Sequence, residues 1–299
     1  MKKKYSGTVV PMITPLMDNW DIDVEAVHRI MTEFAGNDIS PLVLGTTGES
    51  PSIDLEKSLT MVEAAIEAKQ DNQLIYVGLV ENNENEIIRR LELYARLGAD
   101  VIVSTLPSYY TLTPLQIEVF YESLADMSDC PVMMYNIKAT TQMSIPLDVA
   151  EKLSKHPNIV GLKDSERDAE RLETCIRLFK DREDFSFFCG WGAKSFNSLR
   201  MGADGIVPST GNVVPEMYKK LMDAFVSGDY ELAEKMQKLT DEVASLYQKG
   251  RTLGESLAAL KVIMEVKGLC GSRMMPPLTE LSSEETDHLQ KTFKQFYIY

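Results

Sequence analysis

The chain has 299 residues, of which 44% are hydrophobic and 25% charged, a composition typical of a globular protein with a large core. Its 31 lysines and arginines against 45 aspartates and glutamates give a formal charge of −14. This is the wrong sign for a surface that binds nucleic-acid phosphates or anionic lipid. We therefore expect no nucleic-acid and no membrane partner. A small anionic ligand stays possible, because a few local cations or backbone amides can bind it.

The cysteines, the histidines and the N-terminus exclude several other classes. The four cysteines lie far apart without a CxxC pair, which favours buried thiols over a zinc ribbon or a disulfide framework. Two prolines interrupt the short apolar run near the N-terminus, which argues against a signal peptide. No apolar run is long enough to span a bilayer, which argues against a transmembrane helix. The three histidines are scattered, which argues against a metal triad or a Ser-His-Asp triad. We expect a cytoplasmic protein without a metal.

Short apolar, β-branched runs alternate with amphipathic segments along the first two thirds of the chain. The runs that predict strands are 8–13, 42–44, 74–80, 101–105, 132–135, 159–163, 185–189 and 205–209. The segments that predict helices are 24–35, 55–69, 84–97, 114–127, 146–155, 168–179 and 193–201. Eight such alternations are the pattern of a closed parallel (β/α)8 barrel.

A doubly wound open sheet is the main alternative, but the segment after the first strand, TPLMDNWDID, has no glycine and so no GxGxxG turn. Further helices are predicted at 215–226, 229–248, 253–266 and 283–296, without another strand. We therefore expect an α/β protein of the (β/α)8 (TIM) barrel class with a C-terminal helical extension. The predicted division is a barrel at 1–226 and an extension at 227–299.

In barrels of this class the reactive groups follow the carboxyl ends of the strands. The second predicted strand leads into the turn Gly45-Thr46-Thr47-Gly48-Glu49-Ser50, whose amides and hydroxyls could bind a carboxylate or could simply cap the next helix. The fourth leads into Pro107-Ser108-Tyr109-Tyr110. These two tyrosines are as consistent with packing or an interface as with catalysis.

Lys163, at the end of the sixth predicted strand, is the most informative single residue. Apolar surroundings lower the pKa of a lysine and leave a neutral amine that can form a Schiff base with a ketone. The alternative is a structural lysine that either extends its ammonium group to solvent or forms an ion pair, for example with Asp164 or Glu166. Schiff-base chemistry also needs a proton carrier, and with no histidine nearby we expect Tyr135, relayed through Thr46 and a second phenol. Asn136, Trp191 and Lys194 are weaker candidates.

Five motifs in chain order together resemble the dihydrodipicolinate synthase and N-acetylneuraminate lyase family of class I pyruvate-dependent aldolases. They are GTTGES at 45–50, PSYY at 107–110, YN at 135–136, GLKDS around Lys163 and GADGIVPSTGN at 202–212. The resemblance implies a homotetramer, a dimer of dimers, that needs no cofactor beyond a covalent imine between Lys163 and pyruvate or another 2-oxo acid.

The resemblance also implies roles for individual residues. Tyr135 would donate and accept the proton beside the imine, and Thr46 would link it to Tyr109, which reaches the neighbouring subunit's site in many members. Thr47 and the backbone of the turn would bind the carboxylate, and Val207 would present its carbonyl near the imine. Gly45 and Ser209 complete the expected substrate-binding set.

Two departures from the family pattern bear on the second substrate. Dihydrodipicolinate synthases carry an arginine four residues after the asparagine of YN, whereas this chain has Thr140, with Lys138 two residues earlier. Sialate lyases carry an acidic pair where this chain has Trp191-Gly192-Ala193. We therefore predict a lyase or synthase, a carbon-carbon or carbon-oxygen lyase, that acts on pyruvate or a 2-keto-3-deoxy sugar acid. The alternatives are 4-hydroxy-tetrahydrodipicolinate synthase, which uses pyruvate and aspartate semialdehyde, and a non-catalytic 2-oxo acid-binding barrel.

Overall fold

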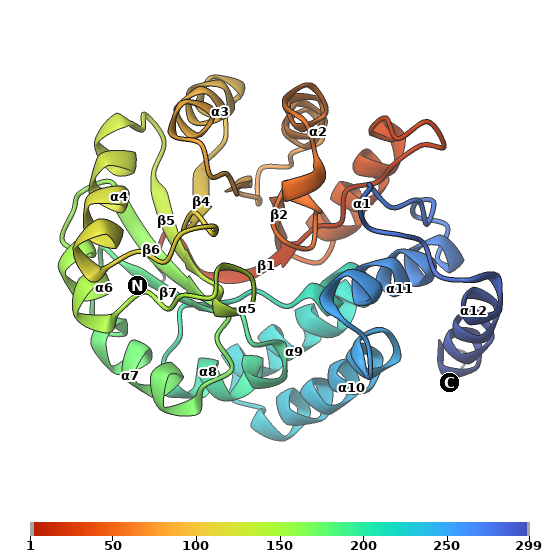
Figure 1. Ribbon diagram of the computed structural model, residues 1–299. Helices are drawn as coiled ribbons and strands as arrows, with labels where there is room; N and C mark the ends of the chain where they lie inside the picture. The colour runs from red at the N-terminus through yellow and green to blue at the C-terminus, as the bar shows by residue number, and fades with distance from the viewer. Residues whose placement is uncertain (1–2, 298–299) are drawn as a thin grey trace.

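The computed structural model describes residues 3–297, and its strands form one closed parallel barrel in the order β1 to β8 (Figure 1). The strands are β1 (Gly7–Pro11), β2 (Ile39–Val43), β3 (Tyr76–Leu79), β4 (Val101–Thr105), β5 (Val132–Asn136), β6 (Ile159–Asp164), β7 (Ser186–Cys189) and β8 (Gly205–Ile206). The barrel closes where β8 pairs with β1. The predicted (β/α)8 barrel is confirmed.

Helices surround the barrel (Figure 1). They are α1 (Val24–Ala35), α2 (Leu55–Glu67), α3 (Glu84–Leu97), α4 (Pro114–Met127), α5 (Lys138–Thr141), α6 (Leu147–Leu153), α7 (Ala169–Phe179), α8 (Ser195–Met201) and α9 (Pro215–Ser227). Several begin at a side chain that accepts a hydrogen bond from the first turn, as Asp23, Asp54 and Asp168 do. These caps set where the helices leave the strand-end loops.

The apolar residues divide into a core between the barrel and its helices and a smaller core inside the barrel. In β5, Val132 and Met134 pack outward against helices, whereas Met133 and Tyr135 point inward. This alternation follows from the two-residue period of a strand. It places a tyrosine hydroxyl inside the barrel near its carboxyl-terminal mouth.

Two predicted strands have the wrong bounds, and one short helix was not predicted. The strand predicted at 205–209 ends at Ile206, and Ser209 lies in the 3₁₀ helix η3 (Ser209–Asn212), because Pro208 has no amide to continue the ladder. The strand predicted at 42–44 begins at Ile39 and runs through Pro41. The sequence also gave no indication of α5, a single turn. The remaining strands and helices lie within a few residues of the predicted ranges.

The C-terminal extension consists of α10 (Tyr230–Gln248), α11 (Leu253–Val266) and α12 (Ser283–Tyr297), which lie along one side of the barrel (Figure 1). Buried residues of α10 and α11, such as Tyr247 and Leu260, belong to the same core as the outer face of the barrel. The division of the chain into a barrel at 1–226 and an extension at 227–299 stays a prediction. The last barrel helix, α9, ends at Ser227, next to this predicted boundary. No helix within residues 3–297 is long and apolar enough to cross a membrane.

Candidate active site

Lys163 and Tyr135 lie side by side at the mouth of the barrel. They are register partners on neighbouring strands, β6 and β5. Leu162 packs outward, so strand alternation turns Lys163 into the barrel, where it is 3% exposed. Its Nζ lies 3.6 Å from the centre of the Tyr135 ring. The structure therefore brings together the amine and the phenol that the sequence singled out.

The acidic neighbours of Lys163 pair with other cations. Asp164 and Glu166 both lie near Arg171, whose Nε is 2.7 Å from Asp164 Oδ2 and 3.6 Å from Glu166 Oε2. Within residues 3–297, Lys163 forms no ion pair with a carboxylate. The alternative of a structural lysine paired with Asp164 or Glu166 is therefore wrong.

Burial and mutual interaction shift the pKa values of this pair. Burial lowers the pKa of Lys163, and its contact with Tyr135 opposes the shift without cancelling it. Burial alone would raise the pKa of the Tyr135 phenol, but a charged Lys163 and hydrogen bonds from Thr46 and Ser165 hold that pKa below its ordinary value. The two groups can thus share one proton, either as amine and phenol or as ammonium and phenolate.

Thr46 belongs to the turn that follows β2, and its Oγ1 lies 3.4 Å from the Tyr135 hydroxyl. The turn is closed by hydrogen bonds from the Gly48 amide to the Gly45 carbonyl and from the Glu49 amide to the Thr46 carbonyl. A side chain at Gly48 would press on the Met12 carbonyl at 3.0 Å. The turn therefore leaves little room for a side chain at this position, and its backbone places Thr46 beside the phenol.

The backbone amides of Thr46 and Thr47 make no hydrogen bond within the described residues. Thr47 itself is buried beside them. Two consecutive amides without a protein acceptor, next to a hydroxyl, form a suitable site for a carboxylate. The sequence left open whether this turn binds an anion or only caps the next helix, and the helix that follows is capped instead by Asp54.

Val207 and Ser209 lie directly after β8. Val207 belongs to the core inside the barrel, and its amide donates to the Cys189 carbonyl. No hydrogen bond within the described region uses the Val207 carbonyl. The hydroxyl of Ser209 instead contacts the Tyr247 hydroxyl of α10 at 2.8 Å. The structure thus shows Ser209 holding the loop after β8 against the extension.

Tyr109 is not brought to Thr46 within one chain. It is 83% exposed, and its ring packs edge-on against that of Tyr110, with the ring centroids 5.0 Å apart. Both rings lie in the loop between β4 and α4, directly before two exposed apolar residues of α4, Leu115 and Val119.

Sequence reasoning missed Ser165 and Arg171. Ser165 follows β6, its amide donates to the Asn136 carbonyl, and its hydroxyl lies where a side chain at Gly190 would be. Arg171 anchors the ends of β5 and β6 through Asp164, which also accepts a hydrogen bond from Asn136. The GLKDSERD run places both residues just after Lys163, but only the register of β5 and β6 shows what they contact.

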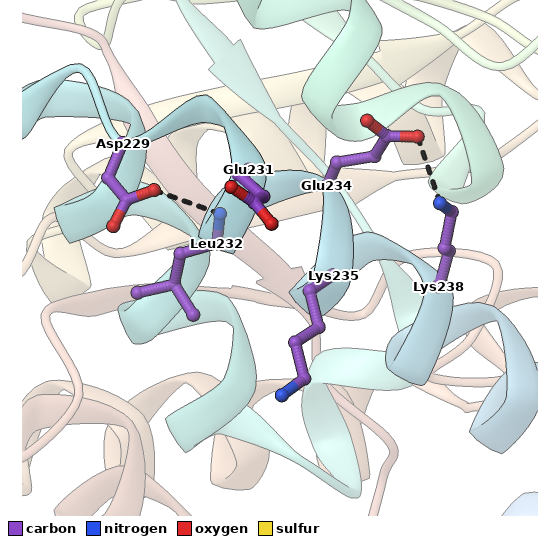
Figure 2. A pocket seen from close by; sticks show the side chains of 6 residues that line it. All are labelled: Asp229, Glu231, Leu232, Glu234, Lys235 and Lys238. Atoms are coloured by element: carbon purple, nitrogen blue, oxygen red, sulfur yellow. Dashed lines mark hydrogen bonds and ion pairs between the residues drawn. The ribbon is translucent and has the colours of Figure 1, made fainter.

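A separate open hollow of about 420 Å³ lies along α10. Figure 2 shows its lining, which includes Asp229, capping the amide of Leu232, and Glu234 paired with Lys238 at 3.0 Å. None of the residues at the barrel mouth lines it. The charged side chains that line this hollow are paired or exposed to solvent, so the hollow offers no buried reactive group comparable to Lys163.

Comparison with known proteins shows the family to which the chain belongs. A model of the dihydrodipicolinate synthetase family matches residues 4–296. The chain belongs to this family. The family resemblance predicted from the motifs is confirmed, and the chain is a Schiff-base-forming lyase or synthase.

Relatives within the dihydrodipicolinate synthetase family align over nearly the whole chain. The 4-hydroxy-tetrahydrodipicolinate synthase of Laribacter hongkongensis is 27% identical over 97% of this chain and 98% of its own. That of Haloarcula marismortui is 29% identical over 96% and 92%.

Among solved structures, dihydrodipicolinate synthase from Bacteroides thetaiotaomicron has a TM-score of 0.92 at 26% identity over 99% of this chain and 100% of that chain. YagE, a prophage protein from E. coli K12 solved in complex with pyruvate, has the same TM-score at 22% identity, covering 99% of this chain and 100% of that one. This second likeness concerns the fold alone.

Proposed function

We propose that Lys163 forms an imine with the ketone of pyruvate or a related 2-oxo acid and that Tyr135 moves the protons beside it. The observation that carries this proposal is the buried Lys163 amine, which has a phenol as its neighbour and, among the residues that the structure describes, no carboxylate in ion-pair contact. Burial lowers the pKa of Lys163, so a larger fraction of the amine is neutral and nucleophilic near pH 7.

The reaction follows from these groups. The Lys163 nitrogen attacks the ketone carbon, and the ketone oxygen takes up a proton from the Tyr135 hydroxyl to give a carbinolamine. The attacking nitrogen returns its surplus proton to the Tyr135 phenolate, and the restored phenol then protonates the carbinolamine hydroxyl, which leaves as water to give a protonated imine. This imine accepts the electron pair released when a proton leaves C3 or when the C3–C4 bond breaks. The Thr46 hydroxyl, 3.4 Å from the phenol, holds Tyr135 and relays its proton.

The turn after β2 would bind the carboxylate of the 2-oxo acid. The amides of Thr46 and Thr47 and the Thr47 hydroxyl supply the donors, and Gly45 supplies the tight backbone. The Val207 carbonyl would accept the N–H of the protonated imine. Ser209 acts through the loop that it holds against Tyr247. The chemistry requires no cofactor or metal, because the imine itself is the electron sink.

Among the possible substrates we favour a 2-keto-3-deoxy sugar acid, whose own C2 ketone would form the imine with Lys163. Thr140, where dihydrodipicolinate synthases have the arginine that binds aspartate semialdehyde, is exposed, and its hydroxyl donates to the Ile137 carbonyl. Lys138 is held by Glu166, with Nζ 3.2 Å from Oε1. A lysine does not replace a forked guanidinium at a carboxylate. The names of the curated relatives favour a second candidate, 4-hydroxy-tetrahydrodipicolinate synthase, at 27% and 29% identity.

We also propose a cytoplasmic homotetramer. The four cysteines are free and buried, as in a reducing compartment. The exposed Tyr109 would complete the proton relay in a neighbouring subunit. A solved relative 22% identical to this chain is described as a monomeric dihydrodipicolinate synthase variant, so the barrel fold is compatible with more than one oligomeric state.

Trapping the imine tests this function. Incubation with pyruvate and sodium borohydride is expected to add one reduced pyruvyl group to the intact mass of the wild type and none to that of Lys163→Ala. The matched control is Lys194→Ala, which removes another lysine near the barrel mouth, one that packs over Trp191, and should keep the adduct. If the wild type gains no mass, a binding barrel without imine chemistry replaces the proposal. An adduct that persists in Lys163→Ala assigns the nucleophile to another residue.

A further inference from the structure

The turn that carries Thr46 and Thr47 is attached to the C-terminal extension by a buried ion pair. Glu49 Oε1 lies 2.5 Å from Lys261 Nζ, and the two side chains are 0% and 1% exposed. Lys261 belongs to α11, in the extension. A charge this deep in a protein is stable only while its partner stays in place. The pair therefore fixes the distance between the turn and α11.

Further hydrogen bonds fix the orientation of the Glu49 carboxylate and the Lys261 ammonium group. The second oxygen of Glu49, Oε2, accepts a hydrogen bond from the Met275 amide at 2.8 Å. Lys261 Nζ also donates to the Arg273 carbonyl at 2.7 Å. The ion pair is thus held between α11 and the segment 273–275, so the carboxylate has both a fixed position and a fixed orientation.

The backbone of Glu49 transmits this orientation to the site. Glu49 has the left-handed conformation, with φ 57° and ψ 26°, which a non-glycine residue keeps only where its surroundings enforce it. Its amide donates to the Thr46 carbonyl at 3.2 Å. That carbonyl and the Thr47 amide belong to one planar peptide. Fixing the Thr46 carbonyl therefore fixes the direction in which the Thr47 N–H points.

We propose that Glu49 and Lys261 are positioning residues through which the C-terminal extension aims the Thr47 amide at the carboxylate of the 2-oxo acid. This inference rests on the proposed function, since it assigns the purpose of the pair through the carboxylate site. It gives the extension a part in substrate binding, although none of its residues needs to touch the substrate.

The test follows exchange of the pyruvate methyl protons for deuterium in D₂O, a reaction that needs imine formation and proton transfer but no second substrate. The deciding variant is Glu49→Gln/Lys261→Met, which removes both charges at nearly constant volume and so avoids an unpaired buried charge. Its half-saturating pyruvate concentration is expected to rise about tenfold or more, with a smaller fall in the maximal rate. Glu49→Asp keeps the charge but shortens the side chain, and it should shift half-saturation in the same direction.

The control is Lys3→Met, which breaks the partly buried Lys3–Asp204 pair, 2.8 Å long, at the opposite end of the barrel. It should lower stability in urea without changing half-saturation. If the Glu49 variants change only the urea midpoint, as the control does, the pair is merely structural and the inference is wrong. If both Glu49 variants fail to fold while Lys3→Met folds, the pair serves the fold, and the inference is again wrong. A wild type that exchanges no methyl protons instead refutes the proposed function.

Discussion

Lys163 and Tyr135 are electrostatically coupled, because the charge of each shifts the pKa of the other. Burial disfavours the ammonium form of Lys163, whereas a phenolate at Tyr135 would favour it. With a neutral amine, the phenol keeps its proton and can deliver it to the ketone oxygen. The geometry that allows this is local, with Lys163 Nζ 3.6 Å from the centre of the Tyr135 ring.

Replacing Tyr135 by Phe tests two roles of the phenol, proton donation and its effect on the pKa of Lys163. The rate of imine trapping should fall about 100-fold or more, because the proton donor is lost. The contacts with Tyr135 that raise the pKa of Lys163 are lost as well, so the pH midpoint of trapping should move lower, further from the ordinary lysine value of 10.5. Trapping rates measured across pH check both effects. Tyr76→Phe, inside the same barrel, is the control, and an unchanged midpoint in Tyr135→Phe would contradict the coupling.

At the scale of elements, the ends of β5 and β6 are joined by a polar network that the sequence could not reveal. Apolar, β-branched runs suffice to predict strands, and the position of Lys163 at a strand end indicates its chemistry. The pairing of Tyr135 with Lys163 depends on strand register, and the contact of Arg171 with Asp164 depends on how α7 returns to the barrel. The start of β2 was predicted too late because a proline, here Pro41, usually marks the boundary of a strand, whereas β2 continues through it.

Removing Arg171 tests what this network contributes to stability. Burial raises the pKa of Asp164 and Arg171 opposes that shift, so Arg171→Met leaves a buried carboxylate without its cation. The expected loss at pH 7 is about 3–5 kcal/mol of the free energy of unfolding. The pKa of Asp164 rises further in the variant, and below that pKa protonation removes the unpaired charge. The loss should therefore shrink as the pH falls toward 5.

Urea unfolding at the two pH values measures this effect. The exposed Arg177→Met on the same helix, whose side chain contacts Thr174, serves as the control and should change stability by about 0.5 kcal/mol or less. A loss in Arg171→Met that is independent of pH would show that packing of Arg171, rather than its pairing with Asp164, stabilises the ends of the strands.

At the scale of the whole molecule, the extension contacts two loops of the candidate site, and an exposed apolar surface lies beside α4. The extension holds the turn after β2 through Lys261 and the loop after β8 through Tyr247. The loop before α4 presents Tyr109 and Tyr110 to solvent, and Leu115 and Val119 continue this apolar surface by one turn of α4. Within one chain Tyr109 lies outside the barrel mouth, so the proposed relay requires a neighbouring subunit.

Disrupting this surface should separate assembly from the chemistry within one barrel. Leu115→Glu/Val119→Glu places two charges on the exposed face of α4, and a desolvated interface does not accept unpaired charges. Light scattering after size exclusion is expected to show a smaller species than the wild type. Pyruvate proton exchange should fall about 100-fold, because Tyr109 no longer completes the relay, while borohydride still traps an imine at Lys163.

The control is Val226→Glu on α9, another exposed apolar residue. If the α4 variant keeps the size of the wild type, the interface lies elsewhere; if it becomes smaller with exchange unchanged, Tyr109 takes no part in proton transfer.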